Sequence, residues 1–460
     1  MSSNLIDMST GSPTKHLLKF ALPLLIGNVF QQFYNMVDSI VVGNFVGPDA
    51  IAAVGTCGSM NFFCFSLSAG LAIGIGIIVA QFFGAKDFAR LRSTIANSIY
   101  VLGLAALIVS LLGFFLSPYV LRLLRCPEAI LGDAVIYMKT TCVGIVFIVL
   151  YNGVASILRA LGDSKSPLYF LIIASIINLI LDLLFVLVFK LAVFGVALAT
   201  IISQAISGIT SLIYAHKKIE YFRLSKKDLR PDLAIIKSSF KLSIPIALQN
   251  CLISISMMVL QQVVNTFGAS VMASYTIIMR IEQLIQQPFS SLGAAITTFS
   301  GQNIGANKID RVRKGFNRGT VIALLFSLFV LVIFQIFANQ IVYLFVKESE
   351  VIRIGAIGLR ITSFFYFALG MIYVPRAVLN GTGDTGFAMI NGMTEVFGRI
   401  VFSHLLVRIP AIVLFGRSIP VGFWGIWLTT CFTWTITAIV CVIRYKSGIW
   451  YKKSVKANLQ

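Results

Sequence analysis

The chain has 460 residues, of which 58% are hydrophobic and 12% charged, and its mean hydropathy is +0.91. A soluble globule of this size needs far more polar surface, so the composition excludes one and predicts a polytopic membrane protein. The net charge of +20 would suit a nucleic-acid-binding surface, but the basic stretches lie between apolar runs long enough to span a bilayer, which indicates cytoplasmic loops and no nucleic-acid partner.

Twelve apolar segments are long enough to be transmembrane helices, and they form two groups of six. The first segment holds Pro23 near its start, where a proline is tolerated but bends the helix. This segment is too long for a cleavable signal peptide and lacks a small-residue cleavage site. The predicted spans are 17–46, 50–80, 92–116, 134–158, 167–190, 192–215, 240–267, 271–301, 315–338, 352–378, 386–409 and 420–445.

A basic linker, residues 216–239, separates an N-terminal bundle, residues 1–215, from a C-terminal bundle, residues 240–460. Together with both tails, the even-numbered loops hold 25 of the 37 Lys and Arg residues, whereas the odd-numbered loops hold 9. The positive-inside rule therefore predicts a multi-pass protein of the cell membrane with both termini in the cytoplasm.

The two bundles repeat one another at a fixed offset of 221 residues. AQFFGAK at 80–86 matches GQNIGAN at 301–307, and the Gly-Asp pair at 162–163 matches the one at 383–384. Units with an even number of helices begin on the same side of the membrane, so these are parallel repeats related by an axis along the membrane normal. The predicted fold is all-α, with two pseudo-symmetric six-helix bundles around a central cavity, which is transporter architecture.

Acidic residues inside the predicted spans are functional candidates, because a carboxylate within a membrane is expensive. At 1.5 Å per residue, Asp38 lies about 28 Å from Lys19 and Asp182 about 26 Å from Lys165, so the two carboxylates share a depth. The alternative is that they lie near the outer membrane surface, within reach of water. The four candidates are Asp38, Asp182, Glu282 and Glu395.

Two further oxygen-bearing side chains lie near that depth. Asn178 precedes Asp182 by one helical turn on the same face, and Thr200 lies about 12 Å into the next helix. Carboxylate, amide and hydroxyl oxygens suit a small cation, and paired carboxylates also suit a proton. A shared depth does not by itself establish a shared pocket.

These features together resemble the MATE family of multidrug and toxic compound extrusion transporters. The resemblance covers essentially the whole chain and depends on the spacing of Pro23, Asp38, Asn178-x-x-x-Asp182 and Thr200, and on the AQFFGAKD loop with its GQNIGANKID copy. It implies that Asp38, Asn178, Asp182 and Thr200 form a cation site in the N-terminal bundle, with Asp38 and Asp182 as ligands if the ion is Na⁺. It also implies that Pro23 permits bending of the first helix when that site is protonated.

The sequence departs from one pattern of that family. Some members carry a coupling glutamate in the seventh helix and an aspartate in the tenth. Here the span 240–267 contains no carboxylate, and the tenth helix has none before Asp384 in the following loop. We therefore place ion coupling in the N-terminal bundle.

The eighth span contributes a polar stripe that could form a substrate-cavity wall or a hydrogen-bonded seam between helices. Glu282 lies beside this stripe. On the eleventh span, Glu395 and Arg399 are four residues apart and are expected to satisfy one another. The stripe consists of Arg280, Gln283 and Gln287.

No motif for an enzyme or a bound cofactor is present. The sequence contains no G-x-x-x-x-G-K-[ST] loop for ATP, so transport is expected to be secondary. The three histidines are too scattered for a metal site, and no nucleophile, base and orienting group occur together. The seven cysteines include no C-x-x-C pair and are interpreted as reduced thiols.

The leading hypothesis is a monomeric antiporter that couples H⁺ or Na⁺ entry to the export of small amphipathic compounds by alternating access. The amphipathic, cationic nature of these substrates is implied by the family resemblance. One alternative keeps the fold and moves lipid-linked saccharides, which would require a strongly cationic cavity. A channel is the alternative from another class, and it would not need paired carboxylates.

Overall fold

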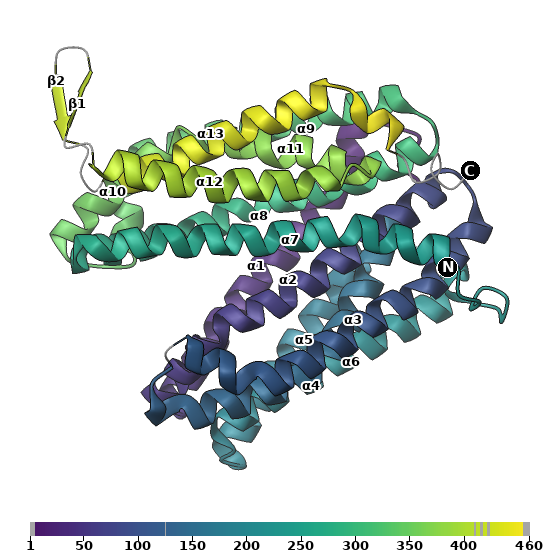
Figure 1. Cartoon of the computed structure of the whole chain (residues 1–460), viewed down its shortest axis with the longest axis horizontal. Helices are drawn as coiled ribbons and strands as arrows, with labels where there is room; N and C mark the ends of the chain where they lie inside the picture. The colour runs from purple at the N-terminus through teal and green to yellow at the C-terminus, as the bar shows by residue number, and fades with distance from the viewer. Residues whose placement is uncertain (1–4, 125, 409–410, 415–416, 421–423, 454–460) are drawn as a thin grey trace.

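The computed structural model describes residues 5–124, 126–408, 411–414, 417–420 and 424–453. These residues are largely helical, with one antiparallel hairpin of β1 (Ala411–Leu414) and β2 (Arg417–Pro420). Figure 1 shows two bundles, α1–α6 and α7–α13, that meet where both termini lie and diverge toward the hairpin. We name these two ends of the molecule the linker end and the hairpin end.

The helices follow the order that the sequence predicts. The first bundle contains α1 (Pro13–Phe45), α2 (Pro48–Gly84), α3 (Phe88–Leu123), α4 (Glu128–Ala160), α5 (Lys165–Leu183) and α6 (Ala192–Lys218). The second contains α7 (Leu233–Val264), α8 (Ala269–Gly305), α9 (Ile309–Tyr343), α10 (Ser349–Ser363), α11 (Tyr366–Thr382), α12 (Gly386–Arg408) and α13 (Trp424–Lys446). Helices α10 and α11 are bent by 48° at a short break and make one broken span. With the bent pair counted once, the described helices form two bundles of six, as the sequence predicts.

Within the described residues, eight helices are long and apolar enough to cross a membrane, and the bent pair makes nine. The other three long helices, α1, α8 and α12, run beside them (Figure 1) and contain 33, 37 and 23 residues. These three helices carry Asp38, the α8 polar stripe and the Glu395–Arg399 pair, which lower their hydropathy.

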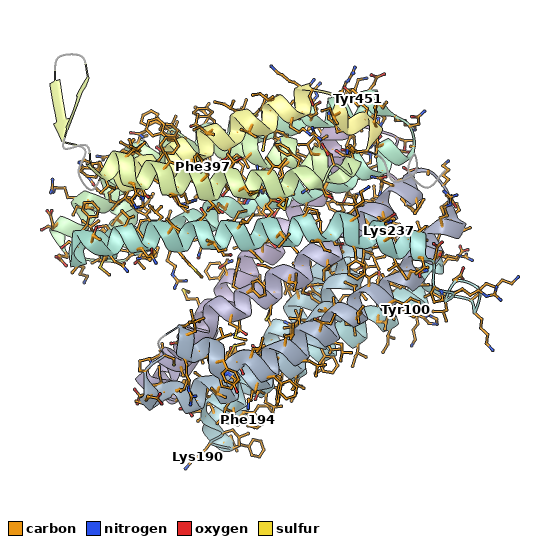
Figure 2. All side chains as sticks on the ribbon, in the orientation of Figure 1. Tyr100, Lys190, Phe194, Lys237, Phe397 and Tyr451 are labelled. Carbon is orange, nitrogen blue, oxygen red and sulfur yellow. The ribbon has the colours of Figure 1, made fainter. Side chains whose placement is uncertain are left out.

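Side chains at the two ends of the bundles are marked in Figure 2. Lys190 and Phe194 lie at the hairpin-end tip of the first bundle, at the turn from α5 to α6. Tyr100, Lys237 and Tyr451 lie toward the linker end, on or beyond α3, α7 and α13. The two ends of the molecule thus correspond to opposite ends of the same helices.

The linker differs from its predicted extent at both ends. Helix α6 continues to Lys218, and α7 begins at Leu233 rather than at residue 240. The early start has a local cause, because the Asp232 carboxylate accepts hydrogen bonds from the backbone N–H groups of Ala234 (2.9 Å) and Ile235 (3.2 Å). Such a cap satisfies amides that the first turn of a helix leaves unpaired.

Each bundle has its own apolar core, but the first helices exchange partners. Leu17 and Phe20 of α1 are fully buried in the core of the second bundle. Leu242 and Ile246 of α7 are buried in the core of the first bundle. The linker-end part of each repeat's first helix therefore packs into the opposite bundle.

Candidate functional site

Two of the four predicted coupling residues are buried together on α5. Asn178 is 1% exposed and Asp182 is 0% exposed, and their spacing places them on one helix face. Beyond Leu183 the helix continues as a π-helical turn, Leu184–Val188, a local irregularity that is frequent at functional sites. The Asn178 amide makes no hydrogen bond to the residues that the structure describes, so it remains available to a ligand.

Thr200 lies at nearly the same level as Asp182. A Cβ added at Gly195 of α6 would lie 3.0 Å from Cβ of Phe185, which fixes the register of the two antiparallel helices. From that contact, Asp182 lies about 5 Å and Thr200 about 8 Å toward the linker end. The Thr200 hydroxyl donates its proton to the Val196 carbonyl at 3.1 Å, so its oxygen lone pairs can face a cation.

Helix α1 brings residue 38 to the level of Asn178. A Cβ added at Gly27 would lie 3.1 Å from Cδ1 of Leu168 on α5. Along each helix from that contact, residue 38 and Asn178 are both about 15 to 17 Å away. The side chain of Asp38 lies outside the described residues. Pro23 is inside α1, nearer the linker end, and its missing N–H removes one backbone hydrogen bond.

The polar stripe on α8 is split from its neighbour Glu282. Arg280 and Gln283 are exposed and Gln287 is half-buried, with its amide donating to the Gln283 carbonyl at 3.0 Å. Glu282 is only 4% exposed and lies within electrostatic range of Arg399 on α12. The stripe thus keeps three of the four predicted cavity residues together, whereas Glu282 lies inside the second bundle.

Four buried or half-buried charges alternate in sign inside the second bundle. Glu395 lies within electrostatic range of both Arg376 and Arg399, and Arg399 lies within range of Glu282. The Arg399 side chain is only 1% exposed. Arg376 lies over the ring of Tyr373, 4.5 Å from its centroid. We name these charges, Arg376, Glu395, Arg399 and Glu282, the charge ladder.

Two glutamines that the sequence reasoning did not single out join the bundles at the linker end. Gln81 of α2 donates from Nε2 to the Gly381 carbonyl at 3.0 Å, and Gln302 of α8 donates to the Ala160 carbonyl at 2.9 Å. Both side chains are 0% exposed. The 221-residue offset relates the two donors and also the two acceptors. Their signal was the AQFFGAK and GQNIGAN repeat, whose second residue is glutamine in both copies.

Glycines allow the same two helices to approach closely. A Cβ at Gly84 would collide with the Gln302 backbone, and a Cβ at Gly305 would collide with the Gln81 backbone. Only a residue without a side chain permits this backbone contact. The linker-end contact between the bundles is therefore built from crossed, repeat-related pairs.

Comparisons with known proteins cover both bundles. The MatE family model matches residues 23–184 and 245–405. Probable multidrug resistance protein YpnP of Bacillus subtilis (strain 168) is 30% identical over 96% of this chain and 97% of its own length. Probable multidrug resistance protein NorM of Thermotoga maritima is 24% identical over 96% of this chain and 94% of its own. A solved outward-facing structure of a multidrug resistance MATE family transporter of the MOP superfamily has a TM-score of 0.88 and 23% identity, with 98% of each chain covered. The chain therefore belongs to the MatE family of transporters.

Proposed function

We propose that this protein is a secondary antiporter of the cell membrane that exports small amphipathic, cationic compounds in exchange for H⁺ or Na⁺. The observation that supports this most directly is the buried Asn178–Asp182 pair at the level of Thr200 and residue 38. Relatives such as YpnP are named as probable multidrug resistance proteins, which supports the export of drug-like compounds.

Ion binding at this site would act through charge and through α1. A proton or a sodium ion neutralises a buried carboxylate, and this gives the ion a different affinity for conformations that desolvate the site to different degrees. Residue 38 of α1 lies at the level of Asn178, whereas Leu17 and Phe20 of the same helix pack in the second bundle. Pro23 lies between these parts, so a bend there would couple the ion site to the contact between bundles.

The exposed polar stripe on α8 is the proposed cavity wall for substrate. Its amides can accept and donate hydrogen bonds to varied ligands. Arg280 would repel cationic compounds unless they bind away from it, so we assign hydrogen bonding to Gln283 and Gln287.

The orientation follows from the distribution of charge. The Lys- and Arg-rich linker, the loops after α2 and α8 and the described parts of both tails lie at the linker end, which we propose is cytoplasmic. We further propose a monomer that needs no resident cofactor, catalyses no covalent reaction and binds no nucleic acid. Each bundle supplies half of the transport path within one chain.

Dye export from loaded vesicles tests the proposal. Wild type is compared with Asp38→Asn and Asp182→Asn under separately imposed pH and Na⁺ gradients, with membrane insertion checked for each variant. Loss of export in either variant is expected, and the gradient that drives wild-type export identifies the ion. Normal export by both variants would contradict ion coupling at this site. Dye movement without any gradient coupling would favour a channel, and an inactive wild type would favour lipid-linked cargo.

A further inference from the structure

The segment that precedes α1 lies across the linker end, and we name residues 6–11 the N-terminal strap. Met8 is 0% exposed and packs in the core of the second bundle. Its backbone N–H donates to Oε1 of Gln302 at 2.8 Å, and its carbonyl accepts from Nδ2 of Asn303 at 3.2 Å. Two adjacent side chains of α8 therefore hold both backbone groups of one strap residue.

Two cationic side chains at the start of α9 hold the rest of the strap. Nζ of Lys308 donates to the Ser9 carbonyl at 2.8 Å. The Arg311 guanidinium donates to three strap carbonyls, those of Met8 (3.0 Å), Thr10 (3.0 Å) and Gly11 (2.9 Å). Hydrogen bonds from charged donors are stronger than those between neutral groups, so Arg311 is the main anchor of the strap.

The other side of the strap touches the first bundle. Gly162 has a φ of +92°, and a Cβ there would collide with the carbonyl of Ile6. Gln302, which binds Met8, also donates to Ala160 at the end of α4. The strap thus lies between the two bundles and contacts both.

A second segment makes the reciprocal crossing. Residues 229–232, which lead into α7, bind α3 of the first bundle. The Tyr100 hydroxyl donates to the Leu229 carbonyl at 2.6 Å, and the backbone N–H of Asp232 donates to Oδ1 of Asn97 at 2.9 Å. Each segment that leads into a bundle therefore binds the third helix of the opposite bundle.

We propose that the N-terminal strap stabilises the conformation in which the linker end is closed, and that Arg311 is the residue that positions it. This inference rests on the proposed alternating access. When the bundles separate at the linker end, the strap cannot keep its contacts with both of them, and in this proposal it leaves α9 and stays against Gly162. Its hydrogen bonds are therefore formed in one conformation and lost in the other, which is the condition for shifting the equilibrium between them.

Thiol labelling measures this equilibrium without requiring ion or dye transport. Ser243 is 0% exposed and its hydroxyl donates to the Leu71 carbonyl across the contact between bundles at 3.0 Å. We would place a single Ser243→Cys in a chain whose seven native cysteines are replaced, and label it with a membrane-impermeant maleimide from the linker side. Arg311→Gln is expected to raise the labelling rate at least tenfold.

Arg313→Gln is the matched control. Arg313 lies on the same helix, but its Nε and Nη2 donate to the Tyr451 hydroxyl of the same bundle at 3.0 and 2.8 Å. The labelling rate at position 243 in the Arg313→Gln variant should equal that in the parent chain. Equal rates for the two arginine variants would overturn the proposal.

A crosslink tests the opposite case, in which the strap cannot leave α8. Cysteines at Met8 and Asn303, joined by a short bis-methanethiosulfonate linker, should abolish dye export and slow labelling at position 243, with both effects reversed by a reductant. Normal export by the crosslinked protein would reject a strap that must be released. Faster labelling of Arg311→Gln, combined with normal export by Asp182→Asn, would retain the strap and reject only the ion site.

Discussion

The two bundles repeat the same helix order but bury charge in different ways. In the second bundle, Glu282 and Glu395 each lie within electrostatic range of an arginine. In the first, the buried carboxylate of Asp182 lies on α5, one helical turn from the buried Asn178 amide. A charge balanced within its own bundle has less need of a mobile cation. The repeated fold therefore does not imply a repeated ion site.

The repeated Gly-Asp loops show the same divergence at the linker end. Asp163 accepts from the backbone N–H of Lys165 at 3.0 Å and from the Ser166 hydroxyl at 2.6 Å, and so caps α5. Its counterpart Asp384 instead accepts two hydrogen bonds from Arg444, at 2.8 and 3.0 Å. The aspartate at the same repeat position therefore caps a helix in the first bundle but pairs with an arginine in the second.

The largest expected effect is on the coupling of dye export to the ion gradient. It distinguishes the buried carboxylate of the first bundle from those of the second. Asp182→Asn should reduce gradient-driven dye export to the level of vesicles without protein, because an amide cannot be neutralised by a proton or bind Na⁺ with a full charge. Glu395→Gln should retain export within about twofold per folded molecule, since the charge ladder is not the proposed ion site. Export rates are normalised to the amount of folded protein in the membrane. Loss of coupling in Glu395→Gln alone would reverse the assignment of the two bundles.

The next effect is on stability and tests whether the charge ladder is internally balanced. Arg399→Met leaves Glu282 and Glu395 without their shared arginine and should lower the free energy of unfolding by about 3 kcal/mol. Adding Glu282→Gln should recover part of this loss, because Arg399 is the arginine within electrostatic range of Glu282, whereas Glu395 also has Arg376. Thermal unfolding in detergent measures both variants. Strictly additive losses would show that the two residues do not interact.

A smaller effect is expected where the two bundles touch. Gly84→Ala should lower the free energy of unfolding by about 1 to 3 kcal/mol, because its Cβ collides with the Gln302 backbone. Gly103→Ala on α3 is the control, since nothing lies within 4 Å of its added Cβ, and alanine there should stabilise the helix slightly. The same melting assay compares them, and indistinguishable variants would argue against a close contact at Gly84.

The smallest effect concerns the diverged loops. Arg444→Gln should lower the free energy of unfolding by about 1 kcal/mol, because Asp384 is buried but the Arg444 side chain is partly exposed to water. The difference from wild type should shrink in about 1 M salt, which screens such charges. Asp163→Ala removes a helix cap instead, and its loss of about 1 kcal/mol should persist in salt. A salt-sensitive effect for both variants would remove the distinction between the loops.

Much of the fold could be predicted from the sequence because two strong signals agree. Long apolar runs give the spans, and the 221-residue offset gives the two bundles. The break between α10 and α11 was not predicted, since Phe364 and Phe365 continue the apolar pattern without a proline or glycine. The sequence prediction places residues 411–419 in a loop between the spans 386–409 and 420–445, so it misses the hairpin β1–β2.

The candidate site was predictable in part for a related reason. Helical rise alone placed Asn178, Asp182 and Thr200 at one level, and the helix contacts at Gly195 and Gly27 agree with that placement. The sequence pattern could not predict that the first helix of each repeat starts in the opposite bundle, and it could not predict the N-terminal strap. Both features depend on which bundle a segment packs against, and local pattern carries no information about that choice.

The crossed contacts of Gln81 and Gln302 have a consequence for the origin of the chain. Each glutamine donates to a carbonyl in the other half. The two-fold operation that exchanges the two halves also exchanges these two hydrogen bonds. This is the geometry of an isologous interface, in which two identical subunits present the same patch to one another. A half-length ancestor that formed a two-fold homodimer would have made both bonds between separate molecules, and fusion of two such copies would keep them without rebuilding the interface.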